Sequence, residues 1–172
     1  EGDVLVFLPG AGEIRACAQE LKAVVAGADS AVSLHPLFGD LPFEEQERAI
    51  MPSPDRRKIV LATNIAETSL TIEGVHVVVD SGLTRVLRYD PASGMNKLMT
   101  VSVSRASAEQ RKGRAGRLGP GVCYRLYEKP AFQSMQEYSH PEILLSDLSS
   151  LVLELGVWGV HDPSDMSWLT PP

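Results

Sequence analysis

Short apolar runs alternate along the chain with stretches whose apolar residues recur at helical spacing. The runs are of strand length and several are rich in β-branched residues. The strands that this pattern predicts are 4–8, 31–34, 58–62, 75–79 and 121–126, and the helices are 14–27, 42–50, 106–115 and 143–155. Runs that are apolar on both faces are typical of a parallel sheet. The alternation predicts an α/β fold, an open and mainly parallel sheet flanked by helices, with ligands bound beyond the carboxyl ends of its strands.

Two features interrupt this alternation. Residues 83–89 and 97–103 flank a turn-forming DPASGM segment, which predicts an antiparallel β-hairpin insertion at about 83–103. The composition then changes near the C-terminal end, where a helical segment leads into GVWGVHDPSDMSWLTPP. We therefore expect one domain over residues 1–130, and a helical extension with the start of another domain over 131–172.

The distribution of charge matters more than the net charge of −6. Residues 131–172 contain six acidic residues and no Lys or Arg, which leaves the first 130 residues neutral. Within these, residues 105–117 contain five basic side chains and one acidic side chain. A patch that binds phosphate groups can therefore lie inside an acidic protein.

Several classes of protein are disfavoured. No apolar run approaches the roughly 20 residues that cross a bilayer. Cys17 and Cys123 are far apart, and neither the cysteines nor the four histidines have the spacing of metal ligands. We expect no metal, no membrane partner and a reducing, cytoplasmic location.

The densest chemical signal is the segment QRKGRAGR. Its arginines, Arg111, Arg114 and Arg117, are three positions apart, which would place them near one face of a helix. Guanidinium groups match phosphate oxygens in bidentate fashion, and glycines between them would permit close approach. The segment predicts a phosphate-binding surface, and a solvated basic helix is the alternative.

A second signal, LATNIAETSLTI, follows an apolar strand. Hydroxyl and amide groups cluster at its carboxyl end, where the N–H groups of a helix start are unpaired. They could contact phosphate or ribose, or Thr63, Asn64 and Thr68 could simply cap a helix. Glu67 in this segment has no basic neighbour that the sequence assigns, and Asp80 either forms a turn or links this segment to the hairpin.

An absence is equally informative. The chain has no G-x-x-x-x-G-K-[ST] loop to cradle a nucleotide, so we expect it not to hydrolyse one alone. Arginines without such a loop suggest that they are supplied to a nucleotide held by another domain.

These segments resemble a known family. QRKGRAGR at 110–117 resembles motif VI of superfamily 2 helicases, TNIAETSLTI at 63–72 resembles motif V of their DEAH-box branch, and LVFLPG at 5–10 resembles motif IV. Gln110 at the head of motif VI favours this branch over the DEAD-box branch, which usually has His there. The tail, with PEILLSDLSSLVLELGVWGV and MSWLTPP, is similar to bacterial HrpB-type DEAH helicases.

The resemblance implies that the chain is the second RecA-like domain of an ATP-dependent RNA helicase and leads into a winged-helix domain. A first RecA-like domain upstream would hold ATP, or another NTP, with Mg. The implied partners are single-stranded RNA and these two neighbouring domains. The complete protein would hydrolyse NTP, whereas this chain alone would be inactive.

The resemblance also implies roles for individual residues. Arg114 and Arg117 would be arginine fingers, and Gln110 would help to place the γ-phosphate or the attacking water. Among the other implied nucleotide contacts, Glu73 would meet the ribose and Ile50 would offer an apolar contact to the base. The remaining implied contacts are Arg111, Gly113, Gly116 and Ser69. The implied nucleic-acid contacts are Thr63, Asn64, Thr71, Arg85 and Arg88, with the hairpin as the strand-separating element.

Two other functions remain open at this point. The arginines could bind only backbone phosphate, in a nucleic-acid-binding module that uses no nucleotide. The chain could also be a protein-interaction domain, with Trp158 or Trp168 as anchors in the acidic tail.

Overall fold

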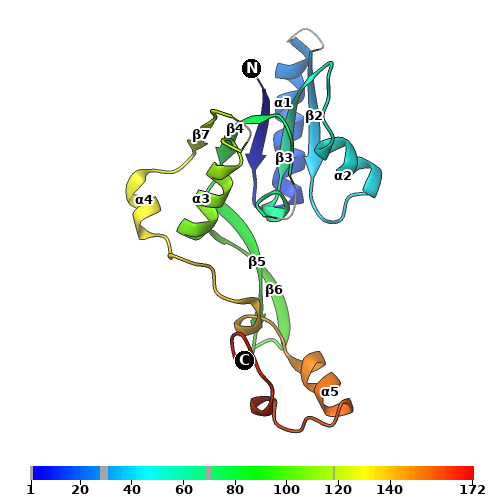
Figure 1. Cartoon of the computed structure of the whole chain (residues 1–172), viewed down its shortest axis with the longest axis vertical. Coiled ribbons are helices and arrows are strands. Elements are labelled where there is room, and N and C mark those ends of the chain that lie inside the picture. Colours follow the sequence, from blue (N-terminus) through cyan, green and yellow to red (C-terminus); the bar gives the residue numbers. More distant parts are fainter. Residues whose placement is uncertain (1, 28–30, 69–70, 118) are drawn as a thin grey trace. The chain divides into compact units, whose positions relative to one another are not determined.

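The computed structural model describes residues 2–27, 31–68, 71–117 and 119–172. It consists of two compact units (Figure 1). The first unit comprises the residues up to 84 together with 100–139, and the second comprises 85–99 together with 140–172. The tip of the hairpin therefore belongs with the C-terminal segment.

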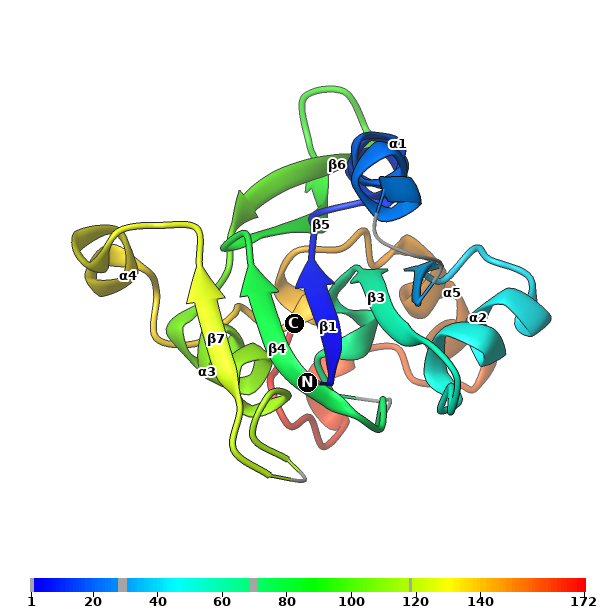
Figure 2. The same cartoon turned by 90° about the horizontal axis from the view of Figure 1, so that it is seen from above.

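A five-stranded parallel sheet forms the centre of the first unit. Its strands are β1 (Asp3–Phe7), β2 (Val32–Leu37), β3 (Arg57–Ala62), β4 (Val75–Asp80) and β7 (Val122–Arg125). Their order is β2-β3-β1-β4-β7, and Figure 2 shows β7, β4, β1 and β3 side by side. This confirms the predicted α/β class with a mainly parallel sheet.

Both faces of this sheet are covered, as the uninterrupted apolar strands predict. On one face, helix α1 (Ala11–Gly27) packs Ile14 against Leu61 of β3. On the other, Phe7 and Val60 belong to a core that includes residues of α2 (Phe43–Ile50) and of the 3₁₀ turn η1 (Asn64–Ala66).

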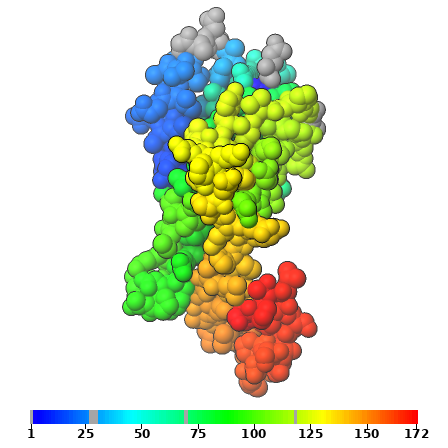
Figure 3. Space-filling view, turned by 90° about the vertical axis from the view of Figure 1, so that its left-hand side faces the viewer, coloured from blue at the N-terminus to red at the C-terminus, as the bar shows by residue number. Residues whose placement is uncertain are grey.

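Two segments complete the first unit. Helix α3 (Arg105–Gly113) follows the hairpin, and the short helix α4 (Lys129–Ser134) follows β7. The chain after α4 returns to the start of α3, where the N–H of Arg105 donates to the carbonyl of Gln136 at 2.8 Å. The yellow and yellow-green surfaces of these segments lie side by side in Figure 3. The start of α3 is thus hydrogen-bonded to the segment that follows α4.

Strands β5 (Leu83–Asp90) and β6 (Met95–Ser102) confirm the predicted hairpin. Most of both strands belongs to the second unit, whereas the first residues of β5 and the last residues of β6 belong to the first unit. The rest of the unit contains η2 (Glu142–Leu144), α5 (Ser149–Val157) and η3 (Pro163–Asp165). Within it, the N–H of Tyr89 donates to the carbonyl of Leu145 at 2.9 Å.

Two predicted boundaries are wrong for identifiable reasons. The helix expected over 143–155 is divided, because Asp147 Oδ1 accepts hydrogen bonds from the N–H (2.9 Å) and hydroxyl (2.6 Å) of Ser149. This local turn competes with a continuous helix and starts a new one. Strand β2 runs past its predicted end at residue 34 and includes Pro36. A proline is tolerated there because β2 lies at the edge of the sheet.

Candidate functional site

The strands of the sheet end level with one another. Phe7 at the end of β1 is in register with Ala62 of β3 and Asp80 of β4, and Ala62 is in register with Leu37 of β2. Motif V and the turn before the hairpin therefore emerge at the same carboxyl edge. This is the edge where the fold class places ligands.

Helix α3 brings the start of motif VI to this region, where Arg111 contacts Asp80. It begins at a capped turn, in which Ser104 Oγ accepts from the N–H of Ser107 at 3.1 Å, and it ends at Gly113. Arg114 occupies the C-cap position and Arg117 lies beyond the helix. The prediction that three arginines share one helical face is therefore wrong, because the helix ends after the first of them.

Arg111 is completely buried, with an exposed fraction of 0%. Its guanidinium donates to Glu67 Oε2 at 3.1 Å, to Asp80 Oδ1 at 2.8 Å and to the carbonyl of Leu83 at 3.2 Å. It also lies over the ring of Phe7, 4.8 Å from its centroid. The anionic partners of this arginine are therefore carboxylates of its own domain rather than a phosphate group.

Arg114 and Arg117 are placed differently. Arg114 is half-buried, and its Nε donates to the backbone carbonyl of Glu67 at 2.8 Å, while a terminal nitrogen contacts the same oxygen. Burial lowers the pKa of the Arg114 guanidinium, and the positive charge of Arg117 lowers it further. Arg117 is exposed. Together they form a pair of cations that an anionic ligand would stabilise.

The remaining motif VI residues leave room around this pair. Gln110, Gly113 and Gly116 are exposed, and a Cβ built on either glycine would meet nothing within 4 Å. Close packing within the unit therefore does not require these glycines. That they permit a close approach of phosphate groups stays a prediction.

Motif V lies just past β3. Thr63 is half-buried and caps η1 with no side-chain hydrogen bond, whereas Asn64 and Thr71 are exposed. Ser69, an implied nucleotide contact, lies outside the described residues. Glu73 is exposed and lies two positions before the start of β4. Capping therefore does not account for the Thr63 hydroxyl.

The end of α2 is held by a buried lysine that sequence analysis missed. Lys58 Nζ donates to the carbonyls of Ala49 at 3.0 Å and Met51 at 2.6 Å, and lies 3.9 Å from Asp3 Oδ2. These contacts fix the position of Ile50, which is partly buried against the core. The only signal of this role was a lysine at the start of an apolar run.

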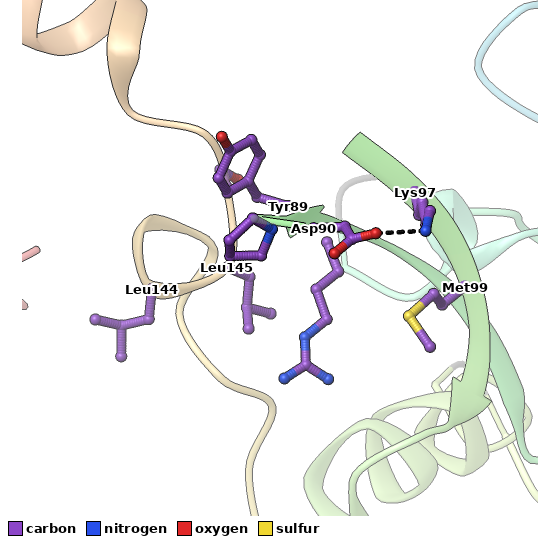
Figure 4. A pocket seen from close by; sticks show the side chains of 9 residues that line it. Tyr89, Asp90, Lys97, Met99, Leu144 and Leu145 are labelled. Atoms are coloured by element: carbon purple, nitrogen blue, oxygen red, sulfur yellow. Dashed lines mark hydrogen bonds and ion pairs between the residues drawn. The ribbon is translucent and has the colours of Figure 1, made fainter. Parts of the chain in front are cut away.

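The two hairpin arginines lie on β5 in the second unit. Arg85 is half-buried and Arg88 is exposed. Arg88 lines a pocket of about 630 Å³ in which Lys97 pairs with Asp90, next to Leu145 (Figure 4). The pocket is thus lined by side chains of both charges together with apolar ones.

Sequence analysis also missed a cluster at the end of β4. Asp80 is fully buried and accepts from Arg111, from the N–H of Gly82 at 2.9 Å and from the hydroxyl of Tyr127 at 2.8 Å. Asp80 therefore both forms the turn and links the motifs, the two readings that the sequence left open. Glu67 supplies the second carboxylate. A carboxylate directly after a β-branched strand was the available signal.

The hydroxyl of Tyr127 should make stability fall at alkaline pH. Burial, followed by the hydrogen bond to Asp80 and its negative charge, raises the pKa of Tyr127 above its ordinary value of 10.0. The folded state therefore favours the neutral phenol, and this stabilisation is present below the ordinary pKa and lost as the pH rises through the folded-state pKa. Between about pH 9 and 11, the free energy of unfolding from urea titrations should fall more steeply for the wild type than for Tyr127→Phe.

Tyr124→Phe is the matched control, since Tyr124 is exposed and lies on β7, the strand that ends just before Tyr127. Its unfolding free energy should follow the wild-type pH dependence. Parallel curves for the wild type and Tyr127→Phe would contradict the assignment.

The part of the chain that the structure describes contains no group of three His, Cys, Asp or Glu side chains that could hold a metal ion. In the same residues, no helix has both the length and the apolar character needed to span a bilayer.

A comparison with protein families matches residues 1–119 to the helicase conserved C-terminal domain. The chain belongs to this family. It is 51% identical to "ATP-dependent RNA helicase HrpB" of Escherichia coli (strain K12), across 99% of this chain and 21% of that protein. It is 43% identical to "Probable ATP-dependent RNA helicase DHX34" of Homo sapiens, across 99% of this chain and 15% of that protein.

Solved structures agree. A crystal structure of the Escherichia coli DEAH/RHA helicase HrpB aligns with a TM-score of 0.92 and 50% identity, over the whole of this chain and 22% of that one. A second, of the E. coli DExH-box NTPase HrpB, gives a TM-score of 0.88 with 50% identity, over the whole of this chain and 21% of that one. The helicase C-terminal domain thus spans about a fifth of the relatives it matches, and its resemblance to the DEAH-box branch and its RecA-like fold are confirmed.

Proposed function

We propose that this helicase C-terminal domain is the second RecA-like domain of an ATP-dependent RNA helicase and supplies Arg114 and Arg117 to an NTP held by another domain. The observation that carries the proposal is the pair of cations at and beyond the end of α3, one anchored by the Glu67 carbonyl and one exposed. The relatives named as ATP-dependent RNA helicases support it.

The chemistry follows from where charge develops. Negative charge builds up on the phosphoryl group and the leaving oxygens during hydrolysis, and cations aimed at that position lower the barrier. Because the domain has no phosphate-cradling loop in its sequence, closure of a cleft between two domains would bring the arginines to the nucleotide. Gln110 would orient the γ-phosphate or the attacking water, and ATP with Mg would be held mainly by the first RecA-like domain.

The same domain would grip single-stranded RNA. The exposed Asn64 and Thr71, together with Thr63, can donate hydrogen bonds to backbone phosphates. Arg85 and Arg88 place positive charge on the hairpin, which would separate the strands. Residues 131–172 would begin a winged-helix domain.

A comparison of this chain with the complete helicase tests the proposal. The complete protein should hydrolyse ATP with stimulation by single-stranded RNA, whereas this chain alone should show no turnover and only weak RNA binding. Phosphate release and fluorescence anisotropy with a labelled RNA measure the two properties. Tight, salt-sensitive RNA binding by the chain alone would instead favour a nucleic-acid-binding module that needs no nucleotide.

A further inference from the structure

Arg111 lies at the centre of a buried network that joins segments far apart in the sequence. It donates to Glu67 in motif V, to Asp80 at the end of β4 and to the carbonyl of Leu83 at the start of the hairpin. The ring of Phe7 covers one face of its guanidinium. Since Arg111 has no exposed surface, a nucleotide in another domain cannot contact it in this conformation.

One end of the network controls an arginine finger. The carboxylate of Glu67 pairs with Arg111 at 3.1 Å, while its backbone carbonyl accepts from Arg114 Nε at 2.8 Å. Both arginines therefore depend on the position of one residue. A shift of Glu67 would displace Arg114, and a displacement of about 1 Å in a catalytic group can cost about 10²-fold in rate.

The other end of the network controls the base of the hairpin. Asp80 Oδ1 accepts from Arg111 and from the N–H of Gly82, whose φ of 74° favours glycine. Asp80 Oδ2 accepts from the hydroxyl of Tyr127. Because the carbonyl of Leu83 also accepts from Arg111, the first residue of β5 and the glycine before it are held by the same group of side chains.

We infer that Arg111 is a positioning residue that couples the arginine finger Arg114 to the base of the hairpin through Glu67, Asp80 and Leu83. The inference rests on the proposed function. A guanidinium suits this role because its planar fork holds acceptors in several fixed directions, whereas an ammonium is a point charge on a flexible stem. The coupling lets a change at the nucleotide reach the element that grips RNA.

Arg111→Lys in the complete helicase tests this role, because it keeps the positive charge and removes the fork. RNA-stimulated kcat should fall about tenfold or more, whereas the KM for NTP should stay within about twofold. The number of base pairs separated per NTP hydrolysed should also fall. Steady-state hydrolysis and a fluorescent unwinding assay measure these quantities at a temperature where the protein is folded.

Arg105→Lys is the matched control. Arg105 lies on the same helix, pairs with the exposed Glu137 at 3.9 Å and shares no hydrogen-bond partner with Arg111 among the described residues. It should retain wild-type kcat and unwinding yield. If Arg111→Lys behaves like this control, the role of Arg111 is merely structural. If its KM for NTP rises strongly at constant kcat, Arg111 contacts the nucleotide directly. Either result overturns the inference.

If Arg111→Lys does not fold, Glu67→Gln decides the question. This variant removes one ion pair of Arg111 and keeps the backbone carbonyl that accepts from Arg114. The unwinding yield per NTP should fall about twofold or more with little change in KM, and an unchanged yield would overturn the inference. A different result would contradict the proposed function, namely NTP turnover at the wild-type rate in an Arg117→Ala variant.

Discussion

Replacing Arg117 with alanine in the complete helicase should lower the rate of NTP hydrolysis by about 10³-fold or more. Arg117 is exposed beyond the end of α3, and its positive charge is close enough to Arg114 to lower the pKa of that side chain. In the proposed mechanism, this second cation would reach the transferring phosphoryl group and would stabilise charge that exists only in the transition state. Its loss should therefore lower kcat far more than it changes substrate binding.

RNA affinity separates this effect from a general defect. Single-stranded RNA should bind Arg117→Ala as it binds the wild type, because motif V and the hairpin are unchanged. Arg56→Ala is the control for loss of surface charge, since Arg56 is exposed just before the amino end of β3 and belongs to neither motif V nor motif VI. Turnover near the wild-type value in Arg117→Ala, measured by phosphate release at saturating RNA, would remove the arginine-finger assignment.

The fold could be predicted because its signals are local. The β-branched runs that became β3 and β4 lie within a residue or two of their predicted bounds, and the turn formers between 83 and 103 gave the hairpin. Burial on both faces leaves such runs no alternative to the interior of a sheet. The position of motif V and Asp80 at one edge then follows from the parallel topology.

The partners of Arg111 could not be predicted because they are not local. Glu67 and Asp80 precede it by 44 and 31 positions, and no periodicity relates them. Helical spacing suggested one surface row, yet α3 ends at Gly113 and separates a buried arginine from one that is half-buried and one that is exposed. Three identical side chains in one motif thus occupy three different environments, which tertiary packing alone decides. The roles assigned to Arg114, Arg117 and Gln110 stay predictions.

Replacing Asp80 with alanine should lower the free energy of unfolding by about 3–5 kcal/mol. Asp80 is fully buried and accepts from three donors, Arg111, Gly82 and Tyr127. Alanine would leave a buried guanidinium with only one carboxylate and would remove the acceptors of an N–H and a hydroxyl. Urea titration of this chain, followed by circular dichroism, measures the loss.

An exposed ion pair in the same unit provides the comparison. Glu137 lies 3.9 Å from Arg105, and their side chains are 66% and 43% exposed. Because water screens such pairs, Glu137→Ala should change the unfolding free energy by about 1 kcal/mol or less. A similarly small loss in Asp80→Ala would contradict this prediction. It would mean that Glu67 alone suffices to stabilise the buried charge of Arg111, and that other contacts support the base of the hairpin.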